Sequence, residues 1–238
     1  MVKPAQRSAP SISVIVPTRN EARLIGGVVQ RLWAVGLSEV IVVDGDSSDR
    51  TAAIARAHGA TVLGGPPGRG LQMNRGAAAA TGEILLFQHA DTRLPDNWVT
   101  HVRRTLAQSQ VSAGAFRLRI DDPRWPFRCL EALIAGRCRF LQLPYGDQAL
   151  FVWAETFRRI GGFAHQQVME DFDLVRRLRR EGRIEIAPIA AITSARRWQR
   201  FGICRTTLLN QICVGGFLLG FEPGRIAAWR DHGVFGRG

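Results

Sequence analysis

The chain has 238 residues, of which 46% are hydrophobic, and a formal net charge of +12. This length and apolar content allow a sizeable core, and they exclude a disordered chain and a small disulfide-stapled fold. Lys3 is the single lysine among 32 basic residues, so arginine must supply any cationic contact inside the fold. Arginine binds phosphate with paired hydrogen bonds. The excess of positive charge suits an anionic ligand, an anionic membrane face or nucleic acid. A compositional bias of the genome explains the preference for arginine equally well.

The first half of the chain alternates strand-like and helix-like segments. Continuous apolar runs predict strands over 11–16, 39–43, 61–63 and 83–87. Helical spacing of apolar residues predicts helices over 21–35, 51–58, 71–80 and 95–107. Strands that are apolar throughout are buried on both faces, which indicates a parallel sheet between helices. Ligands of such sheets bind beyond the carboxyl ends of the strands, here Pro17–Glu21, Asp44–Asp49 and Gln88–Thr92.

The pattern is less regular after about residue 109. Alternation of polar and apolar residues predicts a strand over 113–120, and a loop follows over 121–127. Further on we expect a helix over 128–140, a strand over 148–153 and helices over 170–180, 201–219 and 223–229. The segment 1–10 is polar and is expected to be disordered, with no signal peptide. The cysteines form no C-x-x-C pair, which argues against a zinc site and favours reduced thiols in a cytosolic protein.

Four motifs follow the ends of these strands or open a helix. They are S-V-I-V-P-T-R-N-E-A at 13–22, V-V-D-G-D-S-S-D at 42–49, H-A-D-T at 89–92 and M-E-D-F-D-L at 169–174. In this order they resemble the motifs of family 2 glycosyltransferases, and H-A-D-T together with S-A-R-R-W at 194–198 resembles a small bacterial subgroup. The resemblance implies a GT-A fold, a Rossmann-like α/β architecture with a mostly parallel sheet, flanking helices and C-terminal helices. It also implies a nucleotide-diphosphate sugar as donor.

On this basis we expect a single GT-A domain over 1–238. Its nucleotide-binding half would span 11–108, its acceptor and catalytic half 109–198, and its C-terminal helices 199–238. In the family the loop after the first strand touches the nucleotide, and the acid after the second strand recognises the base. The corresponding residues are Pro17, Thr18, Arg19, Glu21 and Asp44. By position alone, the loop can also be a plain strand-to-helix turn capped by Asn20.

A glycine-rich loop at 64–70 precedes the third helix, and Pro-Pro with four glycines prevents regular structure there. Arg69 and Asn74 open the helix and form a reasonable phosphate grip. The loop is not a P-loop, because the required lysine is missing. A solvated surface loop is the alternative.

The motif H-A-D-T stands where the family usually carries Asp-x-Asp. The resemblance implies that Asp91 binds a divalent ion, Mg²⁺ or Mn²⁺, that bridges the two phosphates of the donor. Such ions prefer one or two carboxylates completed by phosphate oxygens. His89 replaces the first acid, so it contacts the ribose or the ion, or is a structural histidine.

An inverting transfer needs a base that takes the proton of the acceptor hydroxyl. The resemblance assigns this role to Asp171, next to Glu170 at a helix start, although the helix dipole also favours acids there. Asp147 and Gln148 precede a predicted strand and are expected on the acceptor side. Arg197, with Arg196, loosely matches the Q-x-x-R-W element of related transferases and would steady the leaving diphosphate, a solvated basic patch being the alternative.

From residue 174 onward there are 12 arginines and four acids, so this segment contributes 12 − 4 = +8 of the net charge. A basic amphipathic helix here could lie on the inner face of a membrane and reach a lipid-linked acceptor, although packing on the core or in a dimer is favoured. The apolar run at 212–221 is too short to span a bilayer. A cytoplasmic protein is therefore expected, and the oligomeric state is left open.

The sequence thus favours an inverting, metal-assisted glycosyltransferase acting on a hydroxyl acceptor. One alternative is a sugar-phosphate nucleotidylyltransferase, which the lack of an internal lysine disfavours. The other is a basic nucleic-acid-binding module, which the scarcity of aromatic stacking residues disfavours.

Overall fold

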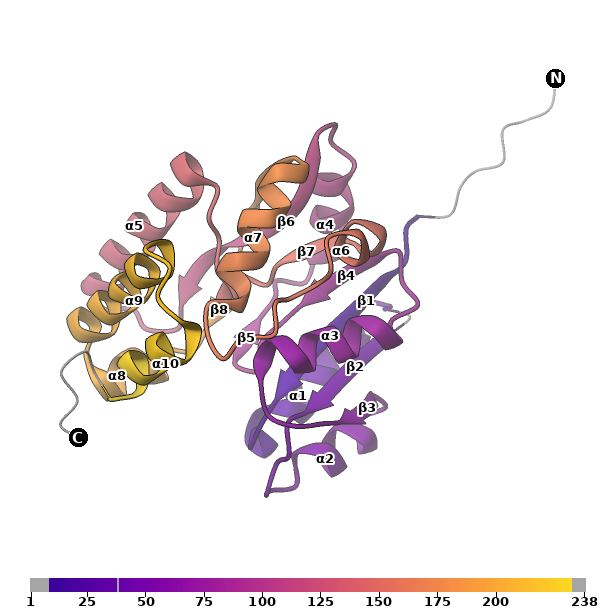
Figure 1. Ribbon diagram of the computed structural model, residues 1–238. Helices are drawn as coiled ribbons and strands as arrows, with labels where there is room; N and C mark the ends of the chain where they lie inside the picture. Colours follow the sequence, from indigo (N-terminus) through magenta and orange to yellow (C-terminus); the bar gives the residue numbers. More distant parts are fainter. Residues whose placement is uncertain (1–8, 38, 233–238) are drawn as a thin grey trace.

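The computed structural model describes residues 9–37 and 39–232, so most of the segment expected to be disordered, 1–10, lies outside the described residues. Within that part of the chain, one sheet has the strand order β3-β2-β1-β4-β7-β6-β8-β5 (Figure 1). The strands are β1 (Ile12–Thr18), β2 (Glu39–Asp44), β3 (Thr61–Gly64), β4 (Ile84–Phe87), β5 (Thr92–Arg93), β6 (Val111–Ile120), β7 (Phe151–Trp153) and β8 (Arg183–Thr193).

Helices connect and cover these strands. They are α1 (Ala22–Ala34), α2 (Thr51–Ala57), α3 (Arg69–Ala79), α4 (Trp98–Leu106), α5 (Trp125–Leu141), α6 (Ala154–Arg159), α7 (Glu170–Glu181), α8 (Arg196–Phe201), α9 (Ile203–Leu218) and α10 (Pro223–His232), with a 3₁₀ turn η1 (Gly146–Gln148). The pairs β1–β2, β2–β3, β1–β4 and β6–β8 are parallel, whereas β7 and β5 run against their neighbours. The α/β class with a mostly parallel sheet is therefore confirmed.

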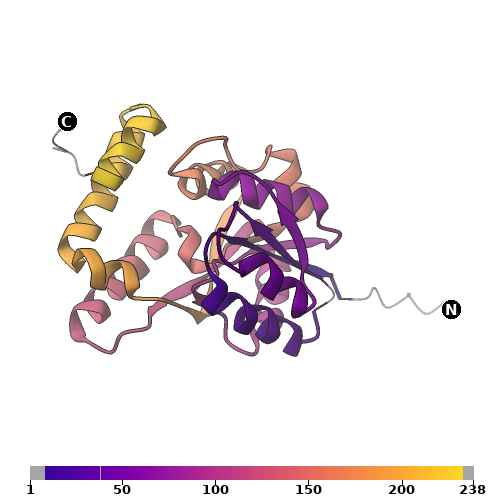
Figure 2. The same ribbon diagram turned by 90° about the horizontal axis from the view of Figure 1, so that it is seen from below.

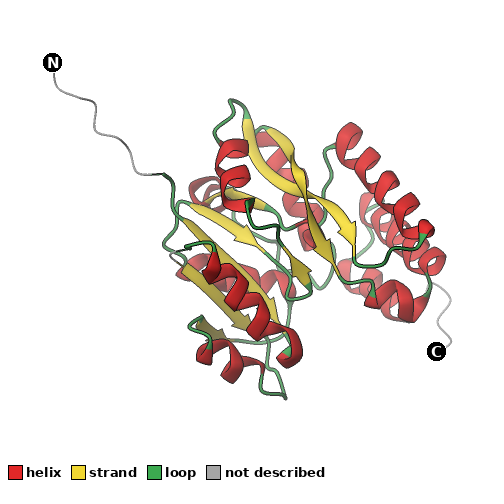
Figure 3. Ribbon diagram, turned by 180° about the vertical axis from the view of Figure 1, so that it is seen from behind, coloured by secondary structure: helices red, strands yellow, loops and turns green. Residues whose placement is uncertain are grey.

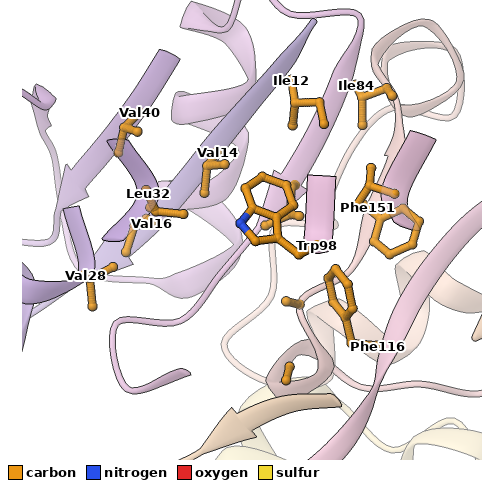
Figure 4. Close-up of a cluster of buried hydrophobic side chains, with 14 of the residues drawn as sticks. Ile12, Val14, Val16, Val28, Leu32, Val40, Ile84, Trp98, Phe116 and Phe151 are labelled. Atoms are coloured by element: carbon orange, nitrogen blue, oxygen red, sulfur yellow. The ribbon is translucent and has the colours of Figure 1, made fainter. Parts of the chain in front are cut away.

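The alternation of side chains along the strands produces two separate apolar layers. On one face, Val14 and Val16 of β1 pack with α1, α2 and α4, and Trp98 lies in the middle of this cluster (Figure 4). On the other face, Ile15 of β1 packs with α3, α6 and α7. The central strands are buried on both sides, as their continuous apolar runs predict.

Two differences from the sequence-based expectation lie in the second half of the chain. β8 was not expected, because Pro188 interrupts its apolar pattern. The structure places this proline at a register shift, where Phe116 pairs with Ala187 and the next residue, Arg117, pairs with Ala190. The extra residues on β8 form a bulge there, so the backbone N–H that Pro188 lacks is not needed for pairing with β6. The helix expected over 201–219 is interrupted by Gly202, whose φ of 83° lies in the left-handed region.

The helices α5, α8, α9 and α10 gather at one end of the molecule, beyond the carboxyl edge of the sheet (Figures 1 and 2). Seen from behind, they form a layer separate from the helices that flank the sheet (Figure 3). They pack in two small clusters, around Phe127 and around Ile226. Among the helices of the described residues, none has the length and apolarity needed to cross a membrane.

The tight contact between α3 and β1 yields a stability prediction. A Cβ on Gly76 would collide with Ile15 Cγ2 and lie 3.1 Å from Val43 Cγ2, whereas a Cβ on Gly136 in α5 would meet nothing within 4 Å. Gly76→Ala should therefore lower the free energy of unfolding by about 1–3 kcal/mol, because the packed layer cannot yield. Gly136→Ala is the matched control and should raise it by about 0.5–1 kcal/mol through helix propensity.

Urea titration followed by circular dichroism measures both changes. Equal stability of the two variants would contradict the packing described for α3.

Candidate active site

The topology brings the ends of distant segments to one edge of the sheet. β1, β2 and β4 are parallel and end there at Thr18, Asp44 and Phe87. β7 is antiparallel to β4, with Phe151 opposite Leu86, so the turn η1 that precedes β7 lies at the same edge. β8 ends opposite β5, with Thr193 paired to Thr92, which carries the start of α8 to this edge.

The two loops after β1 and β2 are tied to each other by hydrogen bonds. The amide of Asn20 donates to Ser47 Oγ at 2.8 Å, and the Ser48 amide donates to Asn20 Oδ1 at 2.8 Å. The Glu21 amide donates to Thr51 Oγ1 at 2.8 Å. Asn20 is not the helix cap that its position suggested, because its φ is 57° and α1 begins only after Glu21.

Asp44 anchors the second of these loops. Its carboxylate accepts hydrogen bonds from the Ser47 amide at 3.0 Å and from Ser47 Oγ at 2.5 Å, and its exposed fraction is 8%. Beneath it, the buried amide of Gln72 donates to the carbonyls of Thr18 and Val43, both at 2.8 Å. Gln72, which the sequence analysis did not single out, therefore fixes the spacing between the two strand ends.

A cavity of about 270 Å³ opens at this edge. Seven of the candidate residues line it: Arg69, His89, Asp91, Asp147, Glu170, Asp171 and Arg197. The other candidates do not line it: Pro17, Thr18, Arg19, Glu21, Asp44, Asn74, Gln148 and Arg196. Apart from Arg196, the acids and arginines expected to act on the diphosphate and the acceptor thus share one cavity, whereas the loops expected to hold the nucleoside lie outside it.

Asp171 is oriented by backbone contacts. Its Oδ2 accepts a hydrogen bond from the Gly146 amide at 2.7 Å, and its Oδ1 accepts one from the Phe172 amide at 2.8 Å. Gly146 permits this approach, because a Cβ there would lie 3.1 Å from His89 Nε2 and 3.2 Å from Asp171 Oδ2. Each carboxylate oxygen keeps a second lone pair that can accept a proton or a hydrogen bond.

Arg196 connects the loop after β1 to the cavity, although it does not line the cavity. One of its guanidinium nitrogens lies 3.4 Å from Glu21 Oε1 and 3.5 Å from Asp91 Oδ2. Burial raises the pKa of Glu21, and the charge and hydrogen bond of Arg196 act in the opposite direction. The bridge makes the loop after β1 and the acid after β4 parts of one charge network.

Two groups in the cavity have strongly shifted pKa values. Burial, together with the charge of Arg69, lowers the pKa of His89 to about 3, so this imidazole is neutral. Burial raises the pKa of Asp147 to about 6, with Arg137 opposing the shift and Asp171 adding to it. Among the described residues, His89 Nε2 and Asp147 Oδ1 are buried and have no hydrogen-bond partner. Such atoms are available to a ligand.

The charges that line the cavity favour a divalent ion. Four carboxylates face two guanidinium groups there, and one of those, Arg69, lies 3.5 Å from Glu170. No cluster of three histidines, cysteines or acids that could hold a metal occurs in the described part of the chain. The donor set, one partly exposed carboxylate on Asp91 and a neutral imidazole that lines the same cavity, fits an ion that takes its remaining ligands from phosphate oxygens.

Two candidate residues have structural contacts instead of facing the cavity. The side-chain amide of Asn74 donates to the Phe163 carbonyl and accepts from the Phe163 amide, both at 2.8 Å. Gln148 is 1% exposed, and its Nε2 donates to the Phe116 carbonyl at 2.8 Å. It belongs to η1, and the strand expected from residue 148 begins at Phe151. Buried amides with such partners position the backbone.

Sequence reasoning missed the side of the cavity that α9 and the segment before η1 supply. Tyr145, Thr206, Asn210, Cys213 and Val214 line it there. The signals were weak: Tyr145 is the single tyrosine of the chain, and Asn210 lies beside Gln211 in a helix of mixed polar and apolar residues. Neither feature has a characteristic spacing from the motifs.

A comparison of the sequence with models of protein families identifies the family of this chain. The model described as "Glycosyl transferase family 2" matches residues 13–171, more than half of the chain. The chain belongs to glycosyl transferase family 2. The match contains the first three motifs and reaches Asp171 in the fourth, which confirms the resemblance at the level of the family. The subgroup suggested by H-A-D-T stays a prediction.

The chain is similar in sequence to two curated synthases. Glucosyl-3-phosphoglycerate synthase of Mycolicibacterium smegmatis is 35% identical over 104 residues, which is 39% of this chain and 34% of the relative. Beta-monoglucosyldiacylglycerol synthase of Synechocystis sp. is 26% identical over 196 residues, which is 71% of this chain and 40% of the relative. The alignments thus cover little more than a third of the length of these relatives.

Solved structures of glucosyl-3-phosphoglycerate synthase have the same fold. Glucosyl-3-phosphoglycerate synthase from Mycobacterium tuberculosis, in complex with Mn²⁺, UDP and glucosyl-3-phosphoglycerate, has a TM-score of 0.61 at 22% identity, over 77% of this chain and 72% of that chain. A complex of the same synthase with Mg²⁺ and UDP has a TM-score of 0.59 at 21% identity, over 77% and 71% of the two chains. These similarities confirm the GT-A fold of this family 2 chain.

The buried carboxyl of Asp147 predicts that replacing it with a neutral amide stabilises the protein at neutral pH. Because its pKa is about 6 in the fold and about 4 in an unfolded chain, the folded state binds more protons between these values. Stability therefore falls as pH rises through this window. Asp147→Asn should raise the free energy of unfolding at pH 7.5 by about 2–3 kcal/mol, with no gain at pH 4.

Urea unfolding in EDTA at both pH values measures this gain. The control is Asp96→Asn, an exposed acid outside the cavity, which should change little at either pH. An equal gain for Asp147→Asn at pH 4 and pH 7.5 would contradict the burial of the charge.

Proposed function

We propose that this chain transfers a sugar from a nucleotide-diphosphate sugar to a hydroxyl acceptor, with inversion at the anomeric carbon. The observation that carries the proposal is the cavity itself, where the acids and arginines of three separated motifs meet at the carboxyl edge of a GT-A sheet. A UDP-hexose donor is supported by the related synthase, whose structures contain UDP-glucose and Mn²⁺. Family membership also disfavours the nucleotidylyltransferase and the nucleic-acid-binding module.

The whole chain is proposed to act as one transferase unit. Residues 11–108 would bind the nucleotide, residues 109–198 the acceptor, and residues 199–238 would complete the site. The continuous sheet supports this division, because strands of both halves belong to it. Asp44 and the loop of Pro17, Thr18, Arg19 and Glu21 would contact the nucleoside, and their mutual hydrogen bonds would hold the two loops in place.

The diphosphate would lie between Arg69 and Arg197. Both arginines line the cavity, and they provide the charge that stabilises the leaving group. Asp91, with His89 beside it, would hold Mg²⁺ or Mn²⁺, an ion that supplies Lewis-acid stabilisation of the departing diphosphate when bound. Arg196 already lies between Glu21 and Asp91, so it can join the diphosphate contacts.

Asp171 would act as the general base. The acceptor oxygen forms a bond to the anomeric carbon, the bond from that carbon to the phosphate oxygen breaks, and the hydroxyl proton moves to Asp171. The backbone hydrogen bonds from Gly146 and Phe172 keep the carboxylate in position without consuming its second lone pairs. Glu170, 4% exposed and paired with Arg69, would position that arginine.

A cytoplasmic site of action is proposed as well. All four cysteines are free, two of them exposed, which suits a reducing compartment. Contact with the inner face of a membrane would suit the exposed apolar side chains on α5 and α9, which include Leu133 and Leu208.

The base assignment can be tested with donor alone. Asp171→Asn should lower the rate of UDP release from UDP-glucose, with water as acceptor, by about 10²–10⁴-fold, because the amide cannot take the proton. The dissociation constant for UDP-glucose should stay unchanged. Asp173→Asn is the matched control on the same helix, where Asp173 pairs with Arg177 at 2.7 Å, and it should keep its activity. Equal turnover of Asp171→Asn and wild type would refute the role.

Metal dependence gives a second test. Mn²⁺ should tighten UDP binding at least about tenfold, and Asp91→Asn should remove this gain, because the ion would connect the carboxylate to the diphosphate. Thermal shift with UDP in Mn²⁺ and in EDTA measures the effect. Asp96→Asn should behave like wild type. If wild type binds UDP equally well in Mn²⁺ and in EDTA, the metal proposal is wrong.

A further inference from the structure

A second cavity of about 540 Å³ lies between α5, α7 and α9. We call it the apolar groove, and its walls include Leu130, Leu133, Leu141, Leu143 and Leu218. Tyr145, Phe172 and Val214 line both this groove and the active-site cavity. The groove therefore borders directly on the proposed site of transfer, and Phe172 follows Asp171 in the chain.

The groove exposes an unusual amount of apolar surface. The exposed fractions of Leu133, Leu141 and Leu218 are 70%, 52% and 57%. α5 and α9, which carry these leucines, both line the groove and lie at the same end of the molecule (Figure 1). Contiguous exposed leucines of this kind mark a binding surface, because burying them against a ligand releases about 25 cal/mol per Å².

The charges along the groove are all positive. Arg137, Arg176 and Arg179 line it, and no acid does so among the described residues. Within that same part of the chain, none of these three guanidinium groups has a carboxylate within 4 Å. Arg137 stacks 3.5 Å above the ring centre of Tyr145, at the border between the two cavities. Arg137 also donates hydrogen bonds to the Leu143 carbonyl and Gln148 Oε1, so its charge is held in place but has no carboxylate at ion-pair distance. An apolar wall with three arginines that lack a carboxylate partner matches a ligand that is both apolar and anionic.

We propose that the acceptor is an anionic amphiphile whose hydrocarbon chain occupies the apolar groove. Its phosphate or carboxylate would contact the arginines, and its hydroxyl would pass Tyr145 and Phe172 to reach Asp171. This proposal rests on the proposed transferase function. A second copy of the chain could cover the leucines, but it would leave unexplained why three residues of the groove also line the reacting cavity.

Alkyl phosphates provide a direct binding probe. We expect the dissociation constant of hexyl, octyl and decyl phosphate for the full chain, measured by calorimetry below their micelle concentrations, to fall about fourfold per methylene, the equivalent of about 0.8 kcal/mol. Leu133→Ser should weaken decyl phosphate binding about tenfold. Leu208→Ser is the matched control, because Leu208 is 61% exposed on α9 and does not line the groove.

The arginines are tested with charged and neutral ligands of equal length. Arg176→Gln should weaken octyl phosphate binding about fivefold and leave octanol binding unchanged. Arg205→Gln, an exposed arginine of α9 outside the groove, should affect neither.

The outcomes separate this inference from the transferase proposal. If UDP-glucose binds and is turned over but alkyl phosphates show no chain-length dependence, or Leu133→Ser and Leu208→Ser weaken binding equally, the groove proposal fails and the transferase stands. If no nucleotide sugar binds, the transferase proposal fails first. Sedimentation of wild type as a dimer and of Leu133→Ser as a monomer would assign the groove to a second copy and overturn the proposal.

Discussion

The repulsion between four carboxylates in one small cavity is the constraint on which the site depends. Asp91, Asp147, Glu170 and Asp171 come from three separate segments, and among the described residues only the arginines Arg69 and Arg197 line the cavity with them. The fold tolerates this arrangement by burying Asp147 with a raised pKa, by pairing Glu170 with Arg69, and by giving Asp171 two backbone donors. The remaining negative charge is what a cation and its phosphate partner would neutralise.

The net charge of the whole chain is positive, opposite in sign to the four carboxylates in the cavity. The net charge of +12 attracts an anionic donor from a distance, whereas the acids at the end of the sheet attract a cation locally. The apolar groove adds three arginines next to this acidic pocket, so positive and negative surfaces meet at Tyr145. Such a boundary can orient a molecule that carries different charges at its two ends.

Much of the fold followed from the sequence, because buried parallel strands are continuous apolar runs and the motif loops must follow them. The family motifs predicted that Asp44, Asp91 and Asp171 would share one cleft with arginines; Asp91, Asp171 and Arg197 line one cavity, whereas Asp44 lies outside it. Asn74 and Gln148 show the limit of this reasoning. Their polar side chains looked like ligand contacts, but whether an amide faces a pocket or a backbone carbonyl depends on packing between segments far apart in sequence. The contribution of α9 was missed for the same reason, since its sequence contains no recognisable motif.

Arg196 shares one guanidinium between Glu21 and Asp91, with all its contacts at 3.4–3.5 Å. Contacts of this length leave each carboxylate incompletely compensated, so the arginine can exchange partners at little energetic cost. The residues it joins are 175 and 105 positions away in the chain. A shift of this one side chain would therefore couple the start of α8 to the loops after β1 and β4 at the same edge of the sheet.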